Sequence, residues 1–208
     1  MATHVNTTIV LQDGTLTNND LSATANIEYT KLRQRPLSEF RIDTTRFRVW
    51  DAINTNPVST AASDDLAIVQ TWGSSQARIT AGDCKALGAT TRRLFFSVPV
   101  PFNYDDGETI QIRFRAKMET TVADTSCTID CDAYSGNDGT LTSDLVSTAA
   151  TSMNSLTAAN YDFTLAPGSI DPGDLLECRL TITCNDAASA TAVTPLIYEV
   201  SLLCDTKG

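Results

Sequence analysis

Apolar and polar residues alternate along several segments in the second half of this chain. In residues 110–118, IQIRFRAKM, every even position is apolar and every odd position is polar, and residues 176–184 and 198–202 follow the same rule. Successive side chains of a strand point to opposite faces of a sheet, so each segment is expected to bury one face and leave the other outside. The pattern predicts an antiparallel sandwich or barrel rather than an α/β fold.

Further short runs of β-branched and aromatic residues extend the strand pattern over most of the chain. Turn residues separate these runs at residues 73–75, 103–107 and 172–174. The runs predict eight or more strands at spacings that suit a jelly roll, and one helical turn is expected within residues 152–159. The expected fold is an all-β, antiparallel, jelly-roll-like β-sandwich with an N-terminal extension.

The first 40 residues differ from the rest of the chain in composition. They are rich in Thr, Asn and Ser, with two short apolar runs at residues 9–11 and 27–29 and a basic run at residues 31–35. Two interpretations stay open: two ordinary strands of the sandwich, or an extended arm that adds to a neighbouring subunit or a larger assembly. The chain is therefore divided into residues 1–40, an arm or added strands, and residues 41–208, the sandwich.

Charge is distributed unevenly along the chain, whose formal net charge is −10. Residues 1–118 carry 13 basic and 12 acidic side chains, whereas residues 119–208 carry 2 and 13. A surface this acidic repels phosphates and anionic lipids, so neither nucleic acid nor membrane is expected as a partner. The sequence shows no secretory signal and no apolar run near the ~20 residues of a membrane span, which predicts synthesis in the cytoplasm.

The six cysteines fit the same alternation. Cys127 and Cys131 share a strand face with Ile129, and Cys178 and Cys184 share the apolar face of a later strand. Such positions suit small hydrophobic side chains, so buried free thiols are expected, while a disulfide between two strands stays open as an alternative. Paired C-x-x-C spacings are absent, so no metal and no other cofactor is expected.

The sequence gives no indication of catalysis. His4 is the single histidine and lies in the N-terminal segment, where no nucleophile is predicted to be held beside it. Acid pairs occur at residues 64–65, at 105–106, and at 130 and 132. A hydrolase that uses such pairs is the least favoured hypothesis, because acids in turns and on outer strand positions are usually solvated. A non-enzymatic protein is expected.

Three stretches of the second half carry a resemblance to a known class of protein. They are residues 93–110, RLFFSVPVPFNYDDGETI; residues 156–163, LTAANYDF; and the segment from PGDLL at 172–176 to VSLL at 200–203. They resemble the jelly-roll virion proteins of tailed bacteriophages, in which a strand ends in a proline and tyrosine turn and a strand opened by Pro-Gly-Asp precedes the final one. The resemblance covers about residues 90–208.

The resemblance implies a capsid decoration, or cement, protein on the capsid exterior of the virion. Such a protein is usually a homotrimer and clamps neighbouring subunits of the major capsid protein. The arm residues expected to bind the capsid are Ile9, Val10, Leu11, Tyr29, Arg33 and Arg35. The residues expected at subunit interfaces are the basic Arg46 and Arg48, which would meet the acidic half of a neighbour, and the apolar Phe95, Ile197 and Leu203, which alternation places on the outer face. A solvated strand face stays open as the alternative for the two arginines.

The alternative function is a carbohydrate-binding module of a phage tail or appendage. Trp50, Trp72 and Tyr134 supply aromatic rings that can stack on sugar rings where they share a sheet face. Packing in the core or at an interface is the competing interpretation of these three side chains.

Overall fold

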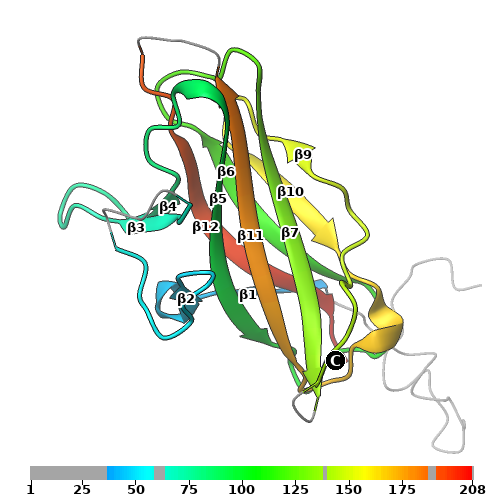
Figure 1. Ribbon diagram of the computed structural model, residues 1–208. Coiled ribbons are helices and arrows are strands. Elements are labelled where there is room, and N and C mark those ends of the chain that lie inside the picture. Colours follow the sequence, from blue (N-terminus) through cyan, green and yellow to red (C-terminus); the bar gives the residue numbers. More distant parts are fainter. Residues whose placement is uncertain (1–36, 59–63, 138–139, 187–190, 208) are drawn as a thin grey trace, which may run out of the picture. The chain divides into compact units, whose positions relative to one another are not determined.

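Two antiparallel sheets pack face to face as a β-sandwich (Figure 1). The computed structural model describes residues 37–58, 64–137, 140–186 and 191–207. Within these ranges it contains no α-helix, only the short 3-10 turns η2 (Thr44–Arg46) and η3 (Pro167–Ser169), and no helix with the length and apolar character needed to cross a bilayer. The all-β sandwich predicted from the alternation is confirmed.

Sheet A is centred on β6 (Ile110–Met118) and β12 (Pro195–Asp205), which pair over nearly their whole length. Its outer strands are β10 (Ala159–Thr164) beside β6, and β1 (Leu37–Arg41), β4 (Arg78–Thr80) and β3 (Ala67–Val69) on the side of β12. Residues 37–40, which composition groups with the N-terminal segment, therefore belong to a strand of the sandwich.

Sheet B is centred on β11 (Leu175–Asp186), which lies between β5 (Ala86–Pro99) and β7 (Ser126–Asn137). Its short outer strands are β2 (Phe47–Arg48) beside β5, and β8 (Thr140–Leu141) and β9 (Thr151–Ser152) beside β7. Three long neighbouring strands thus form one broad face of the molecule, which is turned toward the viewer in Figure 1.

The core lies between the sheets and is filled by the residues that alternation points inward. Along β6 every even residue is buried and every odd residue is at least partly exposed. Rings from both sheets meet across the interior: Phe96 of β5 and Phe114 of β6 have centroids 6.1 Å apart, and Phe114 packs edge-on against Phe163 at 5.7 Å. Burial of these large side chains is the main stabilising contribution.

The proline and tyrosine turn after β5 is fixed by a buried phenol. Tyr104 is fully buried, and its hydroxyl donates a hydrogen bond of 2.7 Å to the carbonyl oxygen of Glu108. Gly107 has a φ of +80°, a conformation that side chains with a Cβ rarely adopt. A second turn precedes β11, where Gly173 has a φ of +92° and a Cβ there would lie 2.6 Å from the Phe102 ring. Both turns therefore require their glycines.

The helical turn expected within residues 152–159 is wrong. Thr151–Ser152 forms β9 instead, and the chain continues as a loop into β10. The backbone N–H of Met153 donates to the carbonyl oxygen of Cys127 at 2.8 Å, and the Met153 side chain is completely buried. Pairing with β7 and burial of one methionine thus override the local preference of this segment.

The expected outward position is wrong for Ile197, whereas Leu203 keeps the outward phase and is nevertheless buried. A β-bulge between Ile197 and Glu199 shifts the phase of β12, so Ile197 joins the core with an exposed fraction of 0%. Leu203 stays outside the core cluster but is only 2% exposed, and it lies between Glu39 of β1 and Gln111 of β6 in the ladder. Ile197 is therefore not available to a neighbouring subunit in this conformation, and the interface role of Leu203 stays a prediction.

All six cysteines are free and buried, as the alternation predicts. Cys127 and Cys184 are direct partners in the ladder between β7 and β11 and contribute to the core. Burial raises the pKa of the Cys204 thiol to about 11, so this thiol is protonated at neutral pH. The cysteines act as small hydrophobic side chains in this fold.

Candidate functional site

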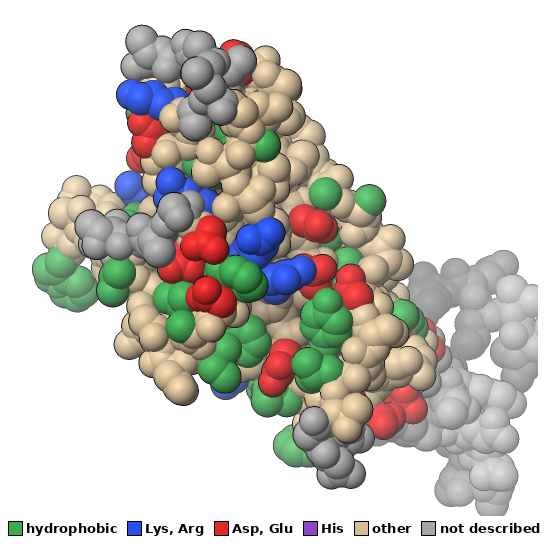
Figure 2. All heavy atoms as spheres, viewed as in Figure 1, with side chains coloured by type: hydrophobic (Ala, Val, Ile, Leu, Met, Phe, Trp, Pro, Cys, Tyr) green, Lys and Arg blue, Asp and Glu red, His purple; other side chains and the backbone are tan. Residues whose placement is uncertain are grey.

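Three aromatic side chains line a hollow on the outer face of sheet B. Its volume is about 260 Å³, and we call it the aromatic hollow. Figure 2 shows this face of the molecule, with hydrophobic side chains beside positive and negative ones near its middle. The lining residues are Trp50, Phe95, Tyr134, Leu141, Glu177, Cys178 and Arg179.

Strand register brings these residues together from distant parts of the sequence. Phe95 of β5 and Arg179 of β11 are ladder partners, and Glu177 of β11 pairs in the same way with Tyr134 of β7. Each lies one residue away from a buried neighbour, so the period of two turns it outward. Trp50 lies on the side of β5 away from β11. It follows Arg48 of β2 by two residues, and Arg48 is the ladder partner of Phe95.

Two arginines in and beside the hollow already have partners within the protein. The Arg93 guanidinium lies 5.0 Å from the ring centroid of Trp50, a cation–π contact. The Arg179 Nε donates to Asp132 Oδ2 at 2.9 Å, and this hydrogen bond raises the pKa of Arg179. Arg179 in the hollow and Arg93 beside it thus have defined partners before any ligand arrives, which lowers the entropy lost on binding.

Burial changes the protonation of two groups on β7. It raises the pKa of the Tyr134 phenol, with the carboxylates of Asp132 and Asp144 adding to the effect. The hydroxyl therefore stays protonated at neutral pH and can both donate and accept a hydrogen bond. Burial also raises the pKa of the Asp130 carboxyl, to which Asp132 and Asp144 contribute in the same direction.

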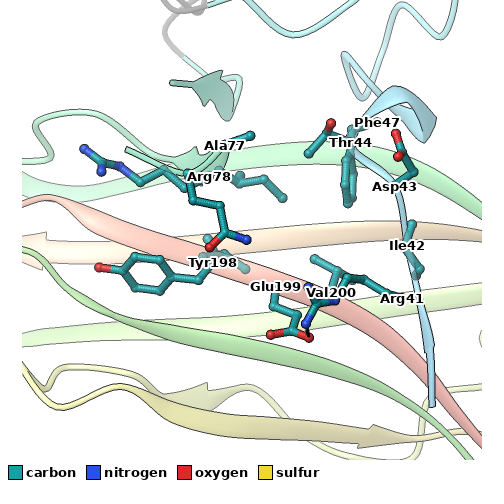
Figure 3. A pocket seen from close by; sticks show the side chains of 13 residues that line it. Arg41, Ile42, Asp43, Thr44, Phe47, Ala77, Arg78, Tyr198, Glu199 and Val200 are labelled. Atoms are coloured by element: carbon teal, nitrogen blue, oxygen red, sulfur yellow. Dashed lines mark hydrogen bonds and ion pairs between the residues drawn. The ribbon is translucent and has the colours of Figure 1, made fainter. Parts of the chain in front are cut away.

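A second hollow, the lateral cleft, opens beside β12 where β1 ends and β4 begins. Its volume is about 310 Å³, and Ile197 and Val200 lie among its apolar lining. Figure 3 shows Arg41, Arg78, Tyr198 and Glu199 among the side chains around it, with Arg41 and Glu199 joined as an ion pair.

The polar groups of the lateral cleft are already engaged within the protein. Besides the Arg41–Glu199 pair, Arg78 contacts Glu119 at 3.4 Å, and the Lys117 ammonium lies 5.9 Å from the Tyr198 ring centroid. A ligand would have to compete with these contacts. The aromatic hollow, which presents three rings and a protonated phenol, is the better candidate site.

The structure brings together only part of the aromatic set considered from the sequence. Trp50 and Tyr134 line the same hollow, whereas Trp72 is 91% exposed in the turn between β3 and β4 and does not line it. Phe95 faces outward as alternation predicts, but sequence reasoning assigned it to a subunit interface and missed its place beside Trp50 and Tyr134. Glu177 and Arg179 were missed as well, although the alternation of residues 176–184 places both on the outer face of their strand.

The remaining predicted residues do not join this site. Arg46 is exposed beside β2, and Arg48 donates to the carbonyl oxygen of Phe47 at 2.7 Å. Their role at a subunit interface stays a prediction, as does that of Phe95. The predicted capsid-binding residues lie outside the described ranges: Ile9, Val10, Leu11, Tyr29, Arg33 and Arg35.

The three acid pairs stand on different elements. Residues 64–65 precede β3, residues 105–106 lie in the turn between β5 and β6, and Asp130 and Asp132 are on the outer face of β7. The part of the chain that the structure describes contains no group of three or more His, Cys, Asp or Glu side chains arranged to hold a metal ion.

Comparison with known proteins identifies similar folds and no family. No family model and no curated protein matches the chain. Among solved structures, the xylan-binding module CBM15 aligns over 83% of this chain and 100% of its own, with a TM-score of 0.47 and 12% identity.

Two further matches are more distant. The CBM22-1 xylan-binding domain of Paenibacillus barcinonensis Xyn10C covers 78% of this chain and 94% of its own, with a TM-score of 0.39 and 12% identity. A structure of infectious bursal disease virus Gt strain covers 74% of this chain and 38% of its own, with a TM-score of 0.39 and 17% identity. Resemblances at this level concern the sandwich, and the function is argued from the site itself.

Proposed function

We propose that this protein is a carbohydrate-binding module whose site is the aromatic hollow. The observation that carries the proposal is that Trp50, Phe95 and Tyr134 line one hollow of about 260 Å³ on the outer face of sheet B. Aromatic faces pack against the apolar C–H face of a sugar ring, and polar groups at the ring edge bind its hydroxyls.

The polar groups needed for the second part of this recognition are present. Tyr134 offers a hydroxyl, Glu177 offers carboxylate oxygens, and Arg179 keeps guanidinium donors beyond the Nε that Asp132 occupies. They come from two neighbouring strands, so backbone pairing fixes their spacing. A preformed site of this kind binds without rearrangement of the sheet.

Affinity electrophoresis and calorimetry with soluble xylan, mixed-linkage β-glucan and mannan test the proposal. Trp50→Ala and Tyr134→Ala are expected to weaken binding about tenfold or more, the range of a central aromatic contact. Trp72→Ala is the matched control, because Trp72 is exposed and lies outside the hollow. Absence of binding to every polysaccharide, or equal loss in all three variants, contradicts the proposal.

A second proposal is the virion role, in which a homotrimer of this chain stabilises a phage head by binding the major capsid protein. An apolar groove of about 310 Å³ favours it, because Phe40 of β1 and Phe102 line this groove and remain 37% and 90% exposed. In this account the purified protein raises the temperature at which emptied phage heads dissociate. A purified protein that is monomeric and leaves the heads unchanged contradicts this role. Phe102→Ala should weaken binding to the heads and leave sugar binding unchanged, because Phe102 lines the groove and not the aromatic hollow.

A further inference from the structure

The outer face of sheet B continues past the aromatic hollow as an ordered polar surface. Register on both sides of β11 defines rows of three residues that cross β5, β11 and β7. Two rows belong to the hollow and two lie beyond it. The rows are Ser97–Glu177–Tyr134, Phe95–Arg179–Asp132, Arg93–Thr181–Asp130 and Thr91–Thr183–Thr128.

The row farthest from the hollow consists only of threonines. The hydroxyls of Thr91 and Thr183 lie 3.1 Å apart and hydrogen-bond to each other, and the Thr128 hydroxyl donates to the backbone carbonyl oxygen of Thr183 at 3.4 Å. Each side chain is partly exposed. Hydroxyls can donate and accept at once, so they match the hydroxyls of a sugar without requiring a charge.

The length of this surface exceeds that of one sugar ring. Outward residues follow one another every second position, about 7 Å along a strand, so four rows span about 20 Å. Three strands give a width of about 10 Å between the outer two. An elongated strip with aromatic rings at one end and hydroxyls at the other suits a chain of sugars that follows β11.

The charge of the strip indicates which chains fit. Arg93 and Arg179 carry its positive charges, and Asp130, Asp132 and Glu177 carry its negative ones. The charge of Arg179 is paired with that of Asp132, and Arg93 lies over the Trp50 ring, so neither guanidinium presents an unpartnered positive charge to a carboxylate or sulfate. With one more acid than base, the strip disfavours anionic polymers.

We infer that the ligand is a linear, uncharged polysaccharide lying along β11, with its sugars spread over the aromatic hollow and the two rows beyond it. This inference rests on the proposed function and adds to it the length, direction and charge of the ligand. Affinity should therefore grow with the number of sugar units until the strip is filled, because each added unit contacts another row.

Calorimetric titration with xylo- and cello-oligosaccharides of two to six units tests the inference. The dissociation constant is expected to fall at least tenfold from the shortest to the longest oligomer of whichever series binds. Thr181→Val keeps the shape and strand propensity of the side chain and removes its hydroxyl. We expect this variant to weaken binding of the longest oligomer several-fold and to leave that of the shortest unchanged.

Controls separate failure of the inference from failure of the proposed function. Thr71→Val, in the turn between β3 and β4, should bind every oligomer like the wild type. Binding that is lost in Trp50→Ala but does not change with oligomer length overturns the inference and leaves the proposed function standing. Tighter binding of polygalacturonate than of any neutral chain also overturns it. No binding of any carbohydrate overturns both.

Discussion

The Phe114 ring connects the two sheets, and its removal gives the sharpest prediction about stability. Phe114 is fully buried and packs against Phe96 of sheet B and Phe163 of sheet A, at centroid distances of 6.1 and 5.7 Å. Truncating a buried phenylalanine to alanine costs about 3–5 kcal/mol through lost burial and the cavity left behind. Two edge-on aromatic contacts place Phe114→Ala in the upper part of that range, since each contributes about 0.5–1.5 kcal/mol.

Urea unfolding followed by circular dichroism measures this loss in the free energy of unfolding. Phe114→Leu fills most of the volume of the ring and is expected to lower the free energy of unfolding by about 1–2 kcal/mol. This variant tests the packing of Phe114 even where the alanine variant does not fold. Phe102→Ala is the control, because its ring is 90% exposed, and a change of about 0.5 kcal/mol or less is expected. A loss below about 1 kcal/mol in Phe114→Ala would refute the packing described for the core.

Three further predictions concern single groups. Tyr104→Phe removes the 2.7 Å hydrogen bond to Glu108 and should lower the free energy of unfolding by about 1 kcal/mol, measured in urea; an unchanged stability contradicts that role. Burial raises the pKa of Asp130 above its ordinary value of 3.8, so ionisation of this carboxyl should cost stability as pH rises from 3.8 through the raised pKa. Other carboxyl groups titrate in both proteins, so the difference is measured: thermal unfolding from pH 3 to 8 should show Asp130→Asn gaining stability relative to the wild type as pH rises, and a difference that falls or stays constant contradicts the shift. The six buried thiols should react with Ellman's reagent only as the protein unfolds, and rapid labelling of the native protein contradicts their burial.

The sandwich was largely predictable because its signal is local. The alternation along β6 and β11 is readable within a single strand, and the turn glycines Gly107 and Gly173 mark where strands end. The bulge in β12 was not predictable in the same way. Alternation covers only residues 198–202, and Ile197 lies just before it in the apolar run 196–198, so the sequence does not fix the face of Ile197. The shift in phase depends on pairing with β6.

The candidate site was predictable only in part, because strand order is not local. Trp50 and Tyr134 lie 84 positions apart in the sequence, and nothing near either residue indicates that β5 and β11 lie between β2, which precedes Trp50, and β7, which holds Tyr134. The same holds for Phe95, whose outward phase was predicted without its neighbours. Residue type and phase identified suitable side chains, and only the order of β2, β5, β11 and β7 shows which of them meet.

The most direct test of the account uses Trp50 itself as the reporter. The chain has two tryptophans, so Trp72→Phe leaves Trp50 as the single indole, within the aromatic hollow. Titration of this variant with the neutral oligosaccharide that binds most tightly should change the Trp50 fluorescence and saturate at the dissociation constant found by calorimetry. Calorimetric binding without any change in Trp50 emission would place the ligand elsewhere and contradict the account.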